Sequence, residues 1–195
     1  MSSPIYVIGL KNDDNLAVKK ILEHVPGSER CKIQAITLRK SDLRGFSFST
    51  GSMSAAAAGR PAAVVLVARN EGRVLLTDRN GFYEEVLEAA CRQARGRIAV
   101  VLTRCPVQDE RSLCDSHFIN NLAEGGGQPK ARALERARRL FTWDDGPNRV
   151  QNEALSDILQ LAMSDQESSI EGLPESWMEP PADEGMFGFL QCGIL

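Results

Sequence analysis

The chain has 195 residues, of which 43% are hydrophobic, and this is enough for one buried core, so we expect a single domain followed by a tail. Its formal net charge of −3 gives no overall attraction to nucleic acid or to anionic lipid. The sequence has neither a signal segment nor an apolar run near the roughly 20 residues of a membrane span, so we expect a cytoplasmic protein. Its five cysteines show no C-x-x-C spacing, which argues against a disulfide framework and a zinc site.

The first third of the chain predicts a strand, a helix, a second strand and a loop. Ile5–Ile8 is a short apolar run that ends at Gly9, and Asn15–Val25 carries apolar residues at helical spacing. Lys32–Leu38 alternates as an edge strand would. Arg39–Arg60 is rich in serine, glycine and alanine, which favours a mobile loop.

The connection after the first strand lies where a phosphate-binding loop of the G-x-x-x-x-G-K-[ST] kind would be found. Only its first glycine, Gly9, is kept, and the later glycine, lysine and hydroxyl residue are replaced by Asp14, Asn15 and Leu16. The adjacent carboxylates of Asp13 and Asp14 would repel a triphosphate. We therefore favour an ordinary strand-to-helix connection with an Asp or Asn helix cap over a working nucleotide site.

The middle of the chain predicts a right-handed βαβ unit. Val64–Val67 and Ile98–Leu102 are continuous apolar runs, which suit parallel strands that are covered on both faces. Between them, Phe82–Gln93 has apolar residues three and four apart and should form an amphipathic helix.

The last third predicts two helices, a short strand and a closing helix. The helices are Ser112–Ala123 and the basic Lys130–Leu140, whose charges indicate a solvated face or, less commonly, an acidic partner. Leu140–Trp143 is expected as the last strand and Val150–Met163 as the closing helix.

The chain is expected to divide into a domain of residues 1–163 and a tail of residues 164–195. From Asp165 onward the sequence has no Lys, Arg or His and many acids and prolines, which is typical of a disordered acidic tail. The final Cys192-Gly193-Ile194-Leu195 fits a prenylation motif with Cys192 as the acceptor, although a chance match is the alternative. Without that modification, the apolar residues 186–190 look like a short protein-docking motif.

The order of several sequence segments in this chain resembles that in the G domain of the immunity-associated GTPases, the GIMAP family of septin-like GTP-binding proteins. The segments that carry the resemblance are Ala63–Val67 with Glu71-Gly72-Arg73 and Leu76-Thr77-Asp78, Val100–Arg104 followed by Arg111–Leu113, and Arg139–Asp145. The resemblance implies an α/β fold: a three-layer, P-loop-NTPase-like (G-domain-like) and mostly parallel sheet flanked by helices. The disordered acidic C-terminal tail would follow it.

The nucleotide motifs of that family are degenerate here. The carboxylate that specifies guanine would fall at Val107, and Asp144 and Asp145 replace two asparagines of the family's pattern. The resemblance therefore implies only a vestigial nucleotide cleft, with GTP and magnesium as the cofactors that it would hold. Its residues would be Gly9, Lys11, Asn15, Thr103, Arg104 and Asp144. No catalytic residue and no metal ligand is assigned.

Three functions are compatible with this sequence. The first is a GIMAP-like pseudo-GTPase that acts as a protein-interaction or scaffold module with weak or absent GTP binding. The second is an active GTP-binding protein with an unusual phosphate loop, which would use Lys11, Thr77, Asp78 and Arg104. The third is a small α/β signalling adaptor unrelated to GTPases. We expect a protein partner, which includes a second copy of the chain, no nucleic acid, and membrane contact only if Cys192 is prenylated.

Overall fold

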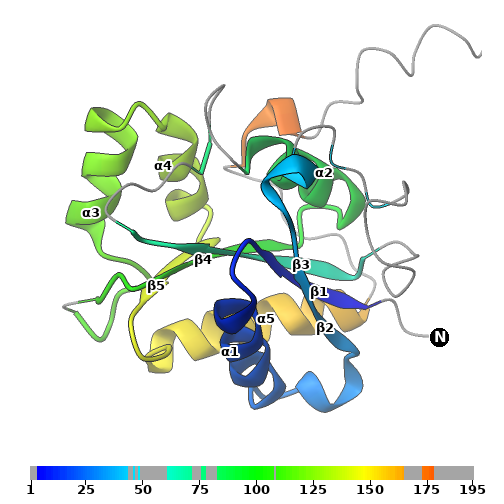
Figure 1. The fold of residues 1–195 in the computed structure, drawn as a ribbon. Helices are drawn as coiled ribbons and strands as arrows, with labels where there is room; N and C mark the ends of the chain where they lie inside the picture. The colour runs from blue at the N-terminus through cyan, green and yellow to red at the C-terminus, as the bar shows by residue number, and fades with distance from the viewer. Residues whose placement is uncertain are drawn as a thin grey trace, which may run out of the picture.

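The computed structural model describes residues 4–43, 46, 48, 61–71, 76–77, 83–107, 109–164 and 173–177. In these residues, five parallel strands form one sheet with helices on both faces, which confirms the expected α/β class and layering (Figure 1). The strands are β1 (Ile5–Gly9), β2 (Ile33–Thr37), β3 (Ala63–Arg69), β4 (Ile98–Thr103) and β5 (Leu140–Trp143). Their order is β2-β1-β3-β4-β5, so β2 lies at an edge as predicted.

The inner strands β1, β3 and β4 are largely apolar because the sheet is covered on both sides. Alternate residues face opposite layers: Tyr6 and Ile8 belong to one core cluster, and Ile5 and Val7 to the other. All five residues of β1 and all six of β4 are buried. This is the burial expected of parallel strands that lie between two helix layers.

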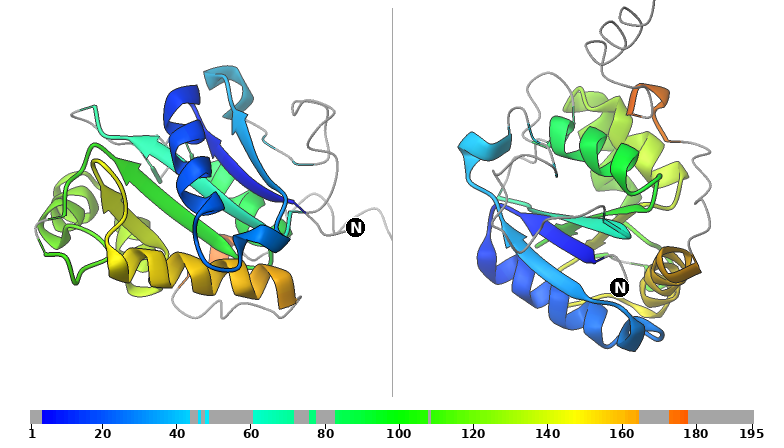
Figure 2. Two further views of the ribbon diagram at one scale, coloured as in Figure 1. Left: turned by 90° about the horizontal axis from the view of Figure 1, so that it is seen from below. Right: turned by 90° about the vertical axis from the view of Figure 1, so that its right-hand side faces the viewer.

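Two helices cover one face of the sheet and three cover the other (Figure 2). The first face carries α1 (Asn12–Glu23) and α5 (Arg149–Ser164). The opposite face carries α2 (Glu84–Gln93), α3 (Ser116–Asn120) and α4 (Pro129–Arg136). Short helical turns are η1 (Ser28–Arg30), η2 (Lys40–Leu43), η4 (Asn121–Gly125) and η5 (Glu175–Trp177). Within the described residues, no helix is both long and apolar enough to cross a bilayer.

The predicted βαβ unit is confirmed, since β3 and β4 pair in parallel and α2 lies between them in the chain. Two helix boundaries in the last third of the chain were wrong. The predicted helix from Ser112 begins only at Ser116, because the Asp115 side chain caps it by accepting a hydrogen bond from the Phe118 N–H at 2.9 Å. The basic helix ends at Arg136, since Arg138 has a φ of 57° and turns the chain into β5.

The predicted loop and tail are more closely packed than their composition indicates. Leu43, Phe46 and Phe48 are buried, and the Phe48 ring stacks on Tyr6 with centroids 5.9 Å apart. In the predicted tail, Leu173 and Trp177 belong to the core on the α2 side of the sheet. The domain therefore takes up part of residues 164–195, and the expectation of a tail that is disordered throughout is wrong for residues 173–177. The remainder of the predicted loop and tail, including Cys192, lies outside the described residues.

Candidate functional site

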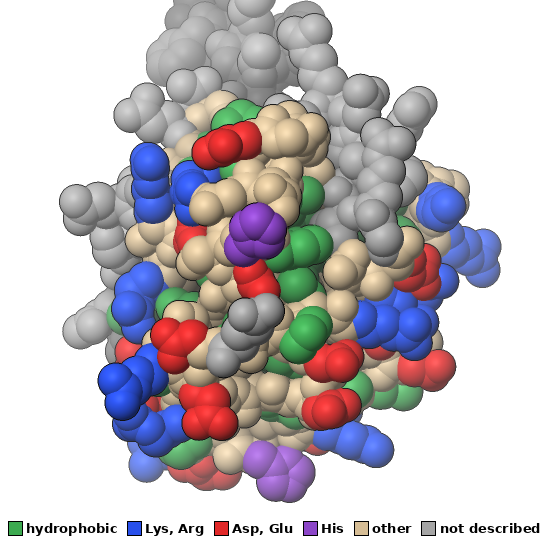
Figure 3. All heavy atoms as spheres, turned by 90° about the vertical axis from the view of Figure 1, so that its left-hand side faces the viewer, with side chains coloured by type: hydrophobic (Ala, Val, Ile, Leu, Met, Phe, Trp, Pro, Cys, Tyr) green, Lys and Arg blue, Asp and Glu red, His purple; other side chains and the backbone are tan. Residues whose placement is uncertain are grey.

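The strand order places a candidate ligand site at the carboxyl ends of β1 and β3. The chain leaves β1 to form β2 on one side and returns to form β3 on the other, so the order reverses between these two neighbours. In open α/β sheets, ligands bind outside the carboxyl ends of the strands at such a reversal. Figure 3 views the molecule from this edge, where the described acidic and basic side chains that face the viewer are interspersed.

The connection between β1 and α1 is too short for a phosphate loop. It consists of Leu10 and Lys11 alone, and α1 already begins at Asn12, so most of the predicted loop is helix. Asp13 and Asp14 stand in the first helical turn, where a carboxylate is stabilised by the helix dipole. These acids therefore start the helix, and the prediction that it begins at Asn15 was wrong by three residues.

Gly9 is required by packing at this connection. A Cβ atom at this position would lie 2.4 Å from Asn15 Oδ1 and 2.4 Å from the Val67 carbonyl oxygen. Since real contacts of a Cβ atom are never this close, only glycine allows α1 and β3 to approach β1 here. The glycine that resembles a phosphate-loop residue thus has a structural role.

Asn15, at the position of the phosphate-binding lysine, points into the protein. It is fully buried, and its Nδ2 group donates hydrogen bonds to the carbonyl oxygens of Gly9 at 3.1 Å and Ile36 at 2.9 Å. Asn15 lies in α1, and its hydrogen bonds connect this helix to the ends of β1 and β2. Its side chain is thus not available to a ligand in solution, whereas Lys11 is exposed.

An ion pair lies across the reversal point. Arg69, the last residue of β3, donates from Nε to Asp14 Oδ2 at 2.6 Å and from Nη2 to Asp14 Oδ1 at 2.7 Å. Both side chains are largely buried, with 17% and 15% exposed. A second, more exposed pair joins Lys11 Nζ to Glu71 Oε1 at 3.4 Å. The cation and the helix N-terminus that could receive a phosphate are therefore both satisfied by Asp14.

Tyr83 lies beside this ion pair and was not identified from the sequence. Burial raises the pKa of Tyr83 to about 12, a hydrogen bond from the Leu10 backbone opposes this, and the nearby carboxylates of Asp14 and Glu71 add to the rise. The phenol is therefore neutral at physiological pH. Arg69, Tyr83 and Glu71 are the residues at this site that sequence reasoning missed.

The predicted guanine side of the cleft is only partly assembled. Thr103 ends β4 beside Arg69, but it is 7% exposed and its hydroxyl has no hydrogen-bond partner. Arg104 and Asp144 are exposed, and Arg104 has a φ of 57°, which turns the chain out of the strand. Thr77 is buried and held through its backbone N–H by Gln128 Oε1 at 3.1 Å, whereas Asp78 lies outside the described residues.

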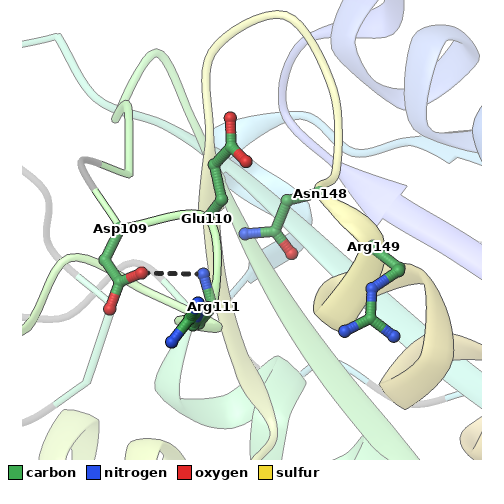
Figure 4. A pocket seen from close by; sticks show the side chains of 5 residues that line it. All are labelled: Asp109, Glu110, Arg111, Asn148 and Arg149. Atoms are coloured by element: carbon green, nitrogen blue, oxygen red, sulfur yellow. Dashed lines mark hydrogen bonds between the residues drawn. The ribbon is translucent and has the colours of Figure 1, made fainter.

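A polar cavity of about 670 Å³ lies at the connections that follow β4 and β5 (Figure 4). Its lining residues are Asp109, Glu110, Arg111, Asn148 and Arg149. Several of its polar groups are engaged in holding the turns: Asn148 caps α5 by accepting from the Gln151 N–H at 2.9 Å, and Asp109 accepts from the Arg111 N–H at 2.9 Å. Among the described residues, no three acidic, cysteine or histidine side chains gather as metal ligands would.

Comparisons with protein-family models, with curated proteins and with solved structures find no match to this chain.

Proposed function

We propose that this chain is a GIMAP-like pseudo-GTPase, a protein-interaction module in which GTP binding is weak or absent. The observation that carries the proposal is the Arg69–Asp14 ion pair at the strand-order reversal. It uses a cation and a helix N-terminus that could otherwise interact with a phosphate group. The framework around it is retained, and a retained framework with a closed ligand crevice is suited to binding other proteins.

A specific observation keeps the unrelated α/β adaptor as a second candidate. The strand order 2-1-3-4-5 is that of flavodoxin-like sheets, in which the ligand also lies between strands 1 and 3. The order is compatible with a P-loop-like sheet as well, so it does not separate the two ancestries. Both candidates lead to the same expectation for nucleotide, because the same ion pair closes the same crevice.

Titration of the protein with a fluorescent GTP analogue and magnesium tests this proposal. We expect no saturation up to about 1 mM nucleotide, a concentration at which a binding free energy of about −4 kcal/mol would already be detected. The variant D13N/D14N loses the ion pair and frees Arg69 and the helix N-terminus, so it should bind the nucleotide more tightly than the wild type if the ion pair closes the crevice. Magnesium-dependent binding in the micromolar range would favour the active GTP-binding alternative and refute the pseudo-GTPase.

A further inference from the structure

The segment Leu173–Trp177 lies on the face of the sheet opposite to α5. The chain leaves α5 at Ser164, and nine residues later Leu173 belongs to the core cluster of α2, α3 and α4. Figure 1 shows η5 above the sheet, on the α2 side, and α5 below it. Trp177 is the largest side chain that is fully buried among the described residues, and Leu173 is 7% exposed.

Trp177 contacts one charged residue of α2, Glu84, and one of α4, Lys130. Its indole Nε1–H donates to Glu84 Oε1 at 2.9 Å, and the ammonium group of Lys130 also donates to that oxygen. The Lys130 Nζ atom lies 5.6 Å from the centroid of the Trp177 ring, within the range of a cation–π contact. We call Glu84, Lys130 and the apolar surface between them the tryptophan site.

The residues of the tryptophan site are held in place by contacts that do not involve Trp177. Glu84 and Lys130 pair with each other directly, so neither charge is left without a partner when the indole departs. The two helices also have their own anchors in the core, which include Leu87 of α2 and Leu134 of α4. The polar and the apolar parts of the site therefore both persist if the segment leaves.

We propose that the tryptophan site is a docking site for peptides with the pattern Leu-x-x-x-Trp, and that Leu173–Trp177 occupies it until such a segment of a partner protein replaces it. The chain's own segment shows the chemistry that is recognised: an indole N–H for Glu84, an aromatic face for Lys130, and a leucine four residues earlier. This inference is independent of whether nucleotide binds.

The test is binding in trans to the full-length chain with the substitution Trp177→Ala. The probe is a fluorescein-labelled peptide of residues 169–181, followed by fluorescence anisotropy. We expect saturable binding to the variant with a dissociation constant below about 1 mM. The wild-type chain should bind at least about tenfold more weakly, because its own segment competes at the effective millimolar concentration of a short tether.

Three controls decide between docking and packing. A peptide with Trp177→Ala should not bind, Lys130→Ala in the W177A chain should weaken peptide binding, and Lys20→Ala on the opposite face should not. The proposal is overturned if the folded W177A chain ignores the peptide, or if wild type and variant bind it equally. It is also overturned if circular dichroism shows that W177A is unfolded, since the segment would then be part of the fold.

Cleavage at a protease site engineered between Ser164 and Leu173 gives a second measurement: the released segment should dissociate on dilution from a domain that stays folded.

Discussion

Removing the guanidinium of Arg69 tests the ion pair at the strand-order reversal most directly. Arg69→Met keeps the length and the apolar contacts of the side chain but leaves the Asp14 carboxylate, 15% exposed, without its bidentate partner. Exposed ion pairs contribute about 0 to 1 kcal/mol, whereas removal of one partner from a buried pair costs about 3 to 5 kcal/mol. Since this pair is largely but not fully buried, we expect the free energy of unfolding to fall by about 2 kcal/mol.

The assay is equilibrium unfolding in urea at neutral pH, with Lys11→Met as the matched control. Lys11 pairs with Glu71 at the same edge, but both side chains are about half exposed, so its loss should cost no more than about 0.5 kcal/mol. A double-mutant cycle of Arg69→Met with Asp14→Asn should give a coupling free energy of about 1 kcal/mol or more. The reasoning is refuted if Arg69→Met costs no more than Lys11→Met, or if the cycle shows no coupling.

Two further predictions concern packing and pH. Gly9→Ala should lower the free energy of unfolding by about 1 to 3 kcal/mol, because the new Cβ would lie 2.4 Å from Asn15 Oδ1 and from the Val67 carbonyl oxygen. Gly125→Ala, where a Cβ would meet nothing within 4 Å, is the control for urea unfolding, and equal effects would contradict the packing role of Gly9. Burial raises the pKa of Cys91 and Cys105 from 9.0 to about 11, so these thiols ionise later in the folded than in the unfolded chain. Their contribution to stability is therefore complete below pH 9 and is lost as the pH rises to about 11. Unfolding measured from pH 8 to pH 11 under reducing conditions should show this decline, and a constant stability over the range would refute it.

The strands could be predicted from the sequence because their signal is local. A buried parallel strand is a continuous apolar run, and Val64–Val67 and Ile98–Leu102 show it without reference to the rest of the chain. The start of α1 was also encoded locally, since Asp13 and Asp14 are typical of a first helical turn. The expected Asp or Asn cap was wrong, because Lys11 stands at the N-cap and no side chain caps the helix.

The ion pair at the reversal point could not be predicted in the same way. Arg69 and Asp14 are 55 residues apart, and each resembles an ordinary charged residue at the end of an element. Only the sheet order, which brings the end of β3 beside the start of α1, makes them neighbours. Trp177 was missed for a different reason: the composition of the tail was averaged over about 30 residues, and a single buried indole does not change such an average.

Trp177 follows α5 in the chain and lies on the opposite face of the sheet, which sets the order in which a force applied from the C-terminal side reaches these described residues. Tension applied at Leu195 travels back along the chain and reaches Trp177 before it reaches any residue of α5. The indole contact with Glu84 and Lys130 is therefore the first point at which a pulling force is resisted among the described residues. A force applied from the C-terminal side of Trp177 is therefore expected to break the indole contacts before those of the sheet.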